Sequence, residues 1–540
     1  MKLTSHLIQR ALHLDAPVTR DVVVQRNLRV PMADGAELLA NRYAPRVGGD
    51  GLPVALMRSP YGRSGLVGMM MARPLAERGF QVIVQSVRGT FGSGGDFDPL
   101  RNERADGLAT IKWVRKQPWF GDSIVLTGAS YLGYVQWAIA DELPPEVKAM
   151  VPQVTESALT LEFLRKDGFS LETPYGWGVL VGSQERRGAL LRQLVEGRRT
   201  RRSMDTLPLG QGDVVALGER SDYIQAILAY DAEHPHWDGI DHRDRVAAVT
   251  VPVSSMGGWY DIFLPGQLRD FKILQEAGRN PRLTVGPWTH LSMDSSMMLE
   301  AISFGLAHAR GDEPPPRAPV RLFVMGEDAW RDFESWPPAG YEPQRFHLQP
   351  DGRLSSAECA SGSSTYRYDP ADPTPAVGGV RMVRGGSGRV DNTSLEERAD
   401  VLTFTTPPLE QDVEVVGEVG AEIWFQSSRP YADVFVRLCD VDADGRSFNV
   451  CDGLTSLTDT DTLGPATVTL WPTAYRFRAG HRIRVQVSSG AFPRFARNPG
   501  TGESPLTATT LLAADQSVHY GVDYPSAVIL PVSAAPNGSN

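Results

Sequence analysis

The feature that most constrains the fold is the alternation of short apolar segments with segments of helical periodicity between residues 53 and 142. The short segments, which contain PVALMRS, FQVIVQSV and SIVLTG, have the length and the β-branched content of buried strands. Helices are expected between and after them, at 68–79, 105–117 and 131–142. Strands and helices in this order predict a parallel sheet that is covered by helices on both faces.

This alternation is interrupted once and is replaced by another pattern near the C-terminus. Residues 148–244 lack regular alternation and are expected to form a helical insertion, after which strand and helix patterns return. From residue 340 onward, short alternating strands are separated by Gly, Pro, Asp and Ser, which is typical of a β-sandwich or jelly roll. Before the first parallel strand, the pair Asp34-Gly35 predicts the turn of an antiparallel hairpin.

The composition limits the classes of function. The chain has 540 residues and a net charge of −10, which argues against binding to nucleic acid or to an anionic membrane surface. It has no apolar run of about 18 residues, and its N-terminus lacks the apolar core of a signal peptide. The three cysteines form no C-x-x-C pattern, so we expect buried free thiols in the reducing cytoplasm and no metal site.

The segment LTGASYLGYVQW (126–137) places a serine between two glycines where a strand is expected to meet a helix. This is the position of a nucleophile elbow, a sharp turn that exposes a catalytic serine. The usual spacing is G-x-S-x-G, whereas the spacing here is G-x-S-x-x-G. A serine in such a turn can also serve only to cap the helix. Ser130 is therefore a candidate nucleophile, which requires a histidine base and a carboxylate that orients the base.

Elimination among the ten histidines identifies a candidate base. His290 follows the strand pattern RLTVGPW, whereas the others precede the core, follow a long helical segment, or lie near the insertion or in the C-terminal β region. The preceding strand pattern, VTVPVSSMGGWYD, ends with Asp261. Ser130, Asp261 and His290 thus occur in the chain order of α/β-hydrolases, each where a strand ends, and ligand sites in α/β sheets form at strand ends.

Acyl transfer also requires hydrogen-bond donors for the oxyanion of the tetrahedral intermediate. The backbone N–H of Tyr131, directly after the serine, is the expected first donor. The second donor should come from the loop after an earlier strand. That loop, RSPYGRSG, has no glycine run but offers the phenol of Tyr61, although a tyrosine at such a place can also serve packing alone.

These segments together resemble the cocaine-esterase-like hydrolases (CocE/NonD), which are relatives of X-Pro dipeptidyl-peptidases and α-amino-acid ester hydrolases. The resemblance is carried by SPYGRSG, SVRGTFGSGGDF, GASYLGYVQW, GGWYDIF, VGPWTH, VRLFVMG, DVFVRLCDVDADGRSF and GHRIRVQVSSGAFPRFARNPGTG. The G-x-S-Y-x-G elbow is distinctive of this group and accounts for the extra residue after the serine.

The resemblance implies an α/β-hydrolase fold with an inserted helical cap and a C-terminal β jelly-roll domain. We expect the α/β core at residues 1–147 and 245–335, the cap at residues 148–244 and the jelly roll at residues 336–540.

For the site, the resemblance implies that Ser130 is the nucleophile, that His290 is the base and that Asp261 orients it. It also implies an oxyanion hole formed by the hydroxyl of Tyr61 and the backbone amide of Tyr131. No cofactor is expected.

The expected substrate is a small-molecule ester of an apolar or aromatic acid. Trp259, Phe263 and Trp288 flank the triad positions and are candidates for the acyl pocket, although each can equally be a core aromatic. In α-amino-acid ester hydrolases, carboxylates soon after the catalytic Asp bind the substrate ammonium. Phe263 and Leu264 stand there in this chain, so an ammonium would find no counter-charge.

We therefore expect a serine esterase that works through an acyl-enzyme. The alternatives are an X-Pro dipeptidyl-peptidase, an α-amino-acid ester hydrolase or acylase, and an acyltransferase with the same triad. A non-catalytic binding protein is disfavoured by the complete Ser, Asp and His set.

Two charged clusters have no role in this interpretation. The segment SQERRGALLRQLVEGRRTRRS contains seven arginines and two glutamates. It could bind acidic substrates or a partner, but a solvated helix face is the commoner explanation. Asp433, Asp440, Asp442 and Asp444 lack the final glutamate of an EF-hand, so ordinary strand-edge and turn acids are expected. The sequence leaves a homodimer open.

Overall fold

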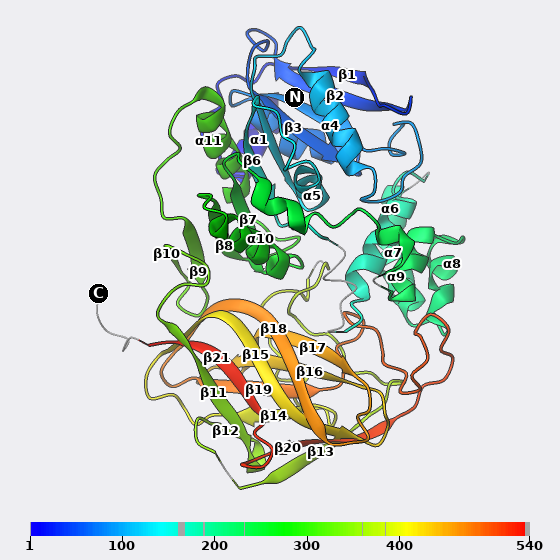
Figure 1. Cartoon of the computed structure of the whole chain (residues 1–540), viewed down its shortest axis with the longest axis vertical. Helices are drawn as coiled ribbons and strands as arrows, with labels where there is room; N and C mark the ends of the chain where they lie inside the picture. The colour runs from blue at the N-terminus through cyan, green and yellow to red at the C-terminus, as the bar shows by residue number, and fades with distance from the viewer. Residues whose placement is uncertain are drawn as a thin grey trace.

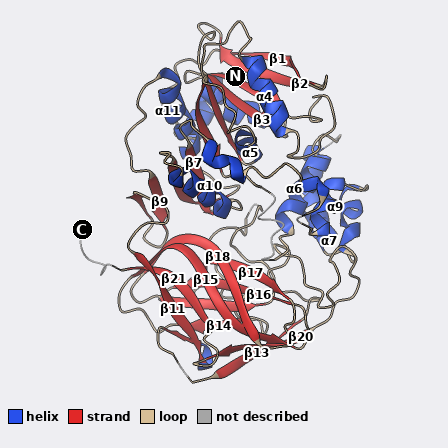
Figure 2. Cartoon of the chain, in the orientation of Figure 1, coloured by secondary structure: helices blue, strands red, loops and turns tan. Residues whose placement is uncertain are grey.

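The computed structural model describes residues 2–159, 168–186, 189–231, 233–358, 360–383 and 385–534. It contains an α/β domain, a group of helices beside it, and a β-rich C-terminal domain (Figure 1). Figure 2 shows that the helices gather in the first two parts, whereas strands dominate the third.

The α/β domain is built on a sheet whose strand order is β1-β2-β4-β3-β5-β6-β7-β8-β9-β10. Neighbours from β4 to β9 along this order are parallel, and β1, β2 and β10 add antiparallel strands at the edges. The strands are β1 (Val22–Pro31), β2 (Glu37–Pro45), β3 (Val54–Ser59), β4 (Gln81–Ser86), β5 (Ile124–Ala129), β6 (Val147–Gln153), β7 (Ser254–Tyr260), β8 (Arg282–Thr289), β9 (Val320–Val324) and β10 (Ala329–Phe333).

Both faces of this sheet are buried, as the sequence predicts. Ala55 and Met57 of β3 enter one hydrophobic core, and Val54 and Leu56 of the same strand enter another, because successive side chains of a strand point to opposite faces. The helices of this domain are α1 (Lys2–Ala11), α2 (Gly65–Val67), the π-helical η1 (Gly68–Ala72), α3 (Arg73–Ala76), α4 (Glu103–Val114), α5 (Tyr131–Trp137), α10 (Leu264–Glu276) and α11 (Ser296–Arg310).

A group of helices separates the two halves of the α/β domain in the chain. The helices of this group that Figure 1 labels lie at one side, between the α/β domain and the β-rich domain. They are α6 (Glu172–Ser183), α7 (Ala189–Met204), η2 (Leu209–Gln211), α8 (Gly212–Leu217), α9 (Asp222–Ala229), η3 (Pro235–Trp237) and η4 (Arg243–Ala248). The expected start of the insertion at residue 148 falls inside β6, which pairs with β5 and β7, so the central sheet continues to Gln153.

The C-terminal domain is a second, larger set of hydrogen-bonded strands in the order β13-β20-β15-β21-β11-β12-β14-β19-β16-β17, with β18 paired to β15. Its elements are β11 (Tyr341–Gln349), η5 (Pro350–Gly352), β12 (Arg353–Ser355), β13 (Gly362–Tyr368), β14 (Leu402–Thr405), β15 (Val413–Ser427), β16 (Ala432–Val441), β17 (Ser447–Leu457), β18 (Gly464–Phe477), β19 (Arg482–Ser488), β20 (Ala514–Tyr520) and β21 (Ala527–Ser533).

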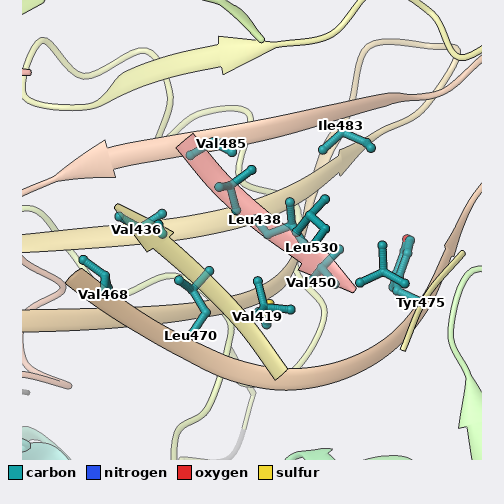
Figure 3. Close-up of a cluster of buried hydrophobic side chains, with 14 of the residues drawn as sticks. Val419, Val436, Leu438, Val450, Val468, Leu470, Tyr475, Ile483, Val485 and Leu530 are labelled. Carbon is teal, nitrogen blue, oxygen red and sulfur yellow. The ribbon is translucent and has the colours of Figure 1, made fainter. Parts of the chain in front are cut away.

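The core of the C-terminal domain continues into the α/β domain. Figure 3 shows part of it, where apolar side chains such as Leu438, Leu470 and Val485 gather between the strands. The same cluster of buried side chains includes Trp259 and Leu283 of the α/β sheet, so the two domains share one continuous apolar core.

Cys439 and Cys451 are buried free thiols in the β-rich domain, as expected. Cys359 lies outside the described residues. Within the described part of the chain, no helix combines the length and the apolar character that crossing a membrane requires.

Candidate active site

Ser130 occupies a strained turn between β5 and α5. Its backbone has φ +59° and ψ −124°, a conformation that non-glycine residues rarely adopt. Neighbouring atoms lie so close to both flanking glycines that neither position has room for a side chain. A Cβ on Gly128 would lie 2.4 Å from the Cβ of Leu132, and a Cβ on Gly133 would lie 2.3 Å from a side-chain carbon of Thr155. The serine is therefore presented at the end of β5, as in a nucleophile elbow.

The three side chains expected to form the triad meet at this turn. His290, directly after β8, has its Nε2 3.0 Å from Ser130 Oγ. Its Nδ1 lies 2.7 Å from Asp261 Oδ2, directly after β7. The carboxylate of Asp261 is fully buried and His290 is 7% exposed, so the hydrogen bond between them is shielded from water. The arrangement lets the histidine take the serine proton while the carboxylate stabilises the resulting imidazolium.

Asp261 is held by groups from two domains. Its Oδ1 accepts a hydrogen bond from the backbone N–H of Phe263 at 2.8 Å, which leaves Oδ2 for the histidine. Its backbone carbonyl accepts a hydrogen bond from the indole N–H of Trp471, on β18 of the C-terminal domain, at 3.1 Å. The orientation of the carboxylate therefore depends on both domains.

The hydroxyl of Tyr61 lies beside the nucleophile. It accepts a hydrogen bond from the indole N–H of Trp177 at 2.9 Å, and the side chain of Ser130 is near enough to lower its pKa. Burial raises the pKa of Tyr61 to about 12, because removal from water disfavours the phenolate. The indole N–H of Trp177 can only donate, so the proton of the Tyr61 hydroxyl must point away from Trp177. It can then point toward Ser130.

The other expected donor, the backbone N–H of Tyr131, is at the first position of α5. The first N–H groups of a helix have no acceptor within the helix. The side chain of Tyr131 fixes this position, because its hydroxyl donates to Glu103 at 2.7 Å and accepts from the backbone N–H of Leu100 at 2.9 Å. Its ring is stacked on Trp177, with 5.9 Å between ring centroids.

Two cavities meet at Ser130, and their linings differ in chemistry. The smaller cavity, of about 40 Å³, is walled by aromatic and aliphatic side chains. It is lined by Tyr61, Leu100, Ser130, Tyr131, Leu159, Thr173, Pro174, Trp177, Tyr223, Ile262, Phe263 and Met382. None of these residues carries a formal charge at neutral pH.

The larger cavity, of about 730 Å³, extends on the side of His290. Its lining joins all three parts of the molecule, since it includes Ala129 of the α/β domain, Trp177 and Arg201 of the inserted helices, and Met382 of the C-terminal domain. Glu172 and Arg381, which also line it, form a bidentate ion pair with distances of 2.6 and 2.7 Å.

The aromatic residues that the sequence suggests for the acyl pocket separate into two groups. Phe263 lines the smaller cavity and packs edge-on against His290. Trp259 and Trp288 line neither of these cavities. Trp259 is 2% exposed and donates to a backbone carbonyl of β9, and Trp288 is buried against Trp330, so the prediction that these two residues line the pocket is wrong.

Sequence reasoning missed two aromatic residues of the site, Trp177 on α6 and Tyr223 on α9. Both line the smaller cavity, and their rings meet edge-on at 5.1 Å. They belong to the insertion, where no strand-and-helix alternation indicated which side chains face the nucleophile.

The four aspartates of the acidic cluster noted in the sequence form hydrogen bonds or ion pairs with other side chains of the protein. Asp440 accepts hydrogen bonds from Tyr475 and His481, and Asp442 and Asp444 are paired with Arg446. Asp433 accepts from Asn498. Among the described residues, no group of three metal-ligating side chains gathers at one point.

Both halves of the chain match families of known proteins. Residues 34–292 match the X-Pro dipeptidyl-peptidase (S15) family, and residues 315–529 match the C-terminal non-catalytic domain of X-Pro dipeptidyl-peptidases. Cocaine esterase of Rhodococcus sp. (strain MB1 Bresler) is 30% identical over an alignment that covers 94% of this chain and 98% of the relative.

Solved structures share the overall fold. An α-amino acid ester hydrolase superposes with a TM-score of 0.81 at 21% identity, covering 96% of this chain and 98% of its own. An aminopeptidase from a marine sediment Thaumarchaeota archaeon superposes with a TM-score of 0.80, also at 21% identity, covering 95% and 97% of the two chains.

Proposed function

The chain belongs to the cocaine-esterase-like (CocE/NonD) family of serine hydrolases, and from this premise we propose that it hydrolyses carboxylic esters of apolar acids through an acyl-enzyme. The observation that carries the proposal is the continuous set of hydrogen bonds from buried Asp261 through His290 to Ser130. The uncharged smaller cavity beside the nucleophile supports an apolar acyl group.

In the first step, Ser130 Oγ attacks the ester carbonyl carbon and His290 Nε2 takes the hydroxyl proton. Asp261 stabilises the imidazolium through Nδ1–H. The carbonyl π electrons move onto oxygen, and this oxyanion accepts hydrogen bonds from the N–H of Tyr131 and the hydroxyl of Tyr61. When the intermediate collapses, the bond to the alcohol oxygen breaks, and His290 returns its proton to that oxygen.

The second step repeats the first with water. His290 takes a proton from a water molecule, whose oxygen attacks the acyl carbon bound to Ser130. Collapse of the second tetrahedral intermediate breaks the bond to Oγ, and the proton held by His290 restores the serine hydroxyl. The acid then leaves and the enzyme is regenerated.

The two cavities suggest where the parts of the substrate lie. His290 must reach the leaving oxygen, and His290 lines the larger cavity but not the smaller one. The alcohol part of the ester is therefore assigned to the larger cavity and the acyl part to the smaller one. Trp177, Tyr223 and Phe263 then provide apolar contact with the acyl group.

The charge of the lining favours an ester over a substrate with a free amino terminus. A peptidase that binds an amino terminus needs an uncompensated carboxylate near the nucleophile. In the described lining of the two cavities, the single carboxylate side chain is Glu172, and it is neutralised by the bidentate contact with Arg381.

The test compares wild type with Ser130→Ala on a panel of substrates. The panel contains p-nitrophenyl butyrate, a benzoyl ester, phenylglycine methyl ester and Ala-Pro-p-nitroanilide. We expect wild type to cleave the first two fastest and Ser130→Ala to lose activity and labelling by a fluorophosphonate probe. Ser303→Ala, at an exposed position on α11, is the matched control and should retain both. Cleavage of Ala-Pro-p-nitroanilide alone would refute the esterase assignment.

A further inference from the structure

The arginine-rich helix α7 turns one face toward the larger cavity. Gly197, Thr200, Arg201 and Met204 all line this cavity, and they recur at the spacing of a single helix face. Part of the arginine cluster noted in the sequence therefore reaches the site, although a solvated face is the commoner role of such a cluster. Arg202, the next residue, is exposed and does not line the cavity.

Arg201 carries an uncompensated positive charge at the edge of this cavity. Arg201 is exposed, and within the described part of the chain its side chain has no ion pair or hydrogen bond. The other arginine of the described lining, Arg381, differs because its side chain is 9% exposed and its guanidinium is paired with Glu172. His290 belongs to the catalytic set. Among the described residues that line the cavity, an anionic ligand thus finds one available guanidinium.

The position of Arg201 assigns it to the alcohol part of the substrate. It lines the larger cavity with His290 and is absent from the lining of the smaller one. A guanidinium presents parallel N–H groups that match a carboxylate. The rest of the lining is mostly apolar, with Val67, Met71, Leu180 and Met293 among its members, so a flat apolar ring between ester and carboxylate fits its chemistry.

We propose that Arg201 is a specificity-determining residue that selects esters whose alcohol part carries a carboxylate. The inference rests on the proposed esterase function and names its substrate class: apolar acids esterified to a hydroxylated carboxylic acid, such as a hydroxybenzoate. Because the carboxylate takes no part in the bonds that form and break, this contact strengthens substrate binding without altering the chemical step.

The test uses two esters with the same acyl group and ring. These are meta-butanoyloxybenzoate, whose leaving group is anionic, and its methyl ester, whose leaving group is neutral. The ratio of their kcat/KM values is measured for wild type, Arg201→Gln and the control Arg202→Gln. This ratio is compared between variants, so the different reactivity of the two leaving phenols cancels.

We expect Arg201→Gln to lower kcat/KM for the anionic ester about fivefold, through KM, as for an exposed ion pair. The neutral ester should be unaffected, and Arg202→Gln should leave both esters unchanged. At about 1 M salt, where the Debye length is about 3 Å, the difference between wild type and Arg201→Gln should largely disappear.

The outcomes separate this inference from the proposed function. If wild type cleaves neither ester, the esterase assignment fails. If wild type cleaves the neutral ester and Arg201→Gln leaves the ratio unchanged, the role of Arg201 is refuted while the esterase assignment remains. An equal loss on both esters, or an equal effect of Arg202→Gln, would also refute selection by Arg201.

Discussion

The hydroxyl of Tyr61 and the indole of Trp177 act as a pair, because the indole accepts no hydrogen bond and so determines which way the phenol can donate. We predict that Tyr61→Phe lowers kcat by a factor of about 10² to 10³ with little change in KM, since the lost donor serves the oxyanion alone. Steady-state kinetics with p-nitrophenyl butyrate, at an unchanged melting temperature, provides the measurement.

Trp177→Phe is the companion variant for this prediction. It keeps an aromatic ring beside Tyr131 but removes the N–H that orients the phenol, so it should cause a smaller loss of kcat than Tyr61→Phe. Since the pKa of Tyr61 is raised to about 12, the phenol stays protonated and the wild-type kcat should not fall as pH rises to about 10. A kcat of Tyr61→Phe near that of wild type would contradict the role of the hydroxyl.

The positions of the proposed triad could be predicted from the sequence because each of them follows a strand of the parallel sheet. Ser130, Asp261 and His290 come directly after β5, β7 and β8, and the topology alone brings these ends to one edge. The pocket could not be predicted in the same way. Trp259 lies within β7 and packs into the core together with Tyr260, whereas Asp261 follows the end of the strand and enters the site, so nearness in sequence to a triad residue does not identify a pocket residue.

The nucleophile elbow depends on close packing between α5 and the segment after β6. A methyl group at Gly133 would overlap Thr155, so Gly133→Ala must displace one of the two elements. We predict a loss of about 2 kcal/mol in the free energy of unfolding, typical of overpacking, together with a lower kcat. Chemical denaturation and esterase kinetics measure the two effects.

Two further variants test this explanation. Thr155→Ser removes the carbon 2.3 Å from the added methyl, so combining it with Gly133→Ala should recover part of the lost stability. Gly464→Ala, where nothing lies within 4 Å of the added methyl, should be neutral. No recovery in the double variant would show that the cost at Gly133 arises elsewhere.

Where the elements differ from the sequence-based expectation, tertiary contacts account for the difference. The helix expected at 68–79 is instead divided into α2, η1 and α3. Gly68 approaches the phenol of Tyr43 so closely that a Cβ would lie 2.2 Å from its oxygen, a contact that periodicity cannot reveal. The sequence pattern does not indicate β6, because this strand contains a lysine and a proline. Its strand character comes from pairing with β5 and β7.

The C-terminal domain contributes to the active site as well as to stability. Trp471 donates from β18 to the backbone carbonyl of Asp261, and the hydroxyl of the adjacent Tyr260 donates to the carbonyl of Asn449 at 3.2 Å. Arg494 forms a buried ion pair with Asp452. Its Cζ lies 5.4 Å from the ring centroid of Trp471, so the guanidinium packs over the indole. The chain at Asp261, the proposed orienting carboxylate, is thus hydrogen-bonded to the β-rich domain at two consecutive residues.

This fastening predicts that Trp471→Phe lowers kcat several-fold, because losing one hydrogen bond of about 1 kcal/mol loosens Asp261 while the apolar packing of the ring is kept. KM should change little, since Trp471 lines neither cavity that meets at Ser130. The control is Trp424→Phe on β15, whose ring packs on Tyr524 within the C-terminal domain and should leave kcat unchanged. Equal kcat for Trp471→Phe and wild type would show that the C-terminal domain supports the fold without positioning the triad.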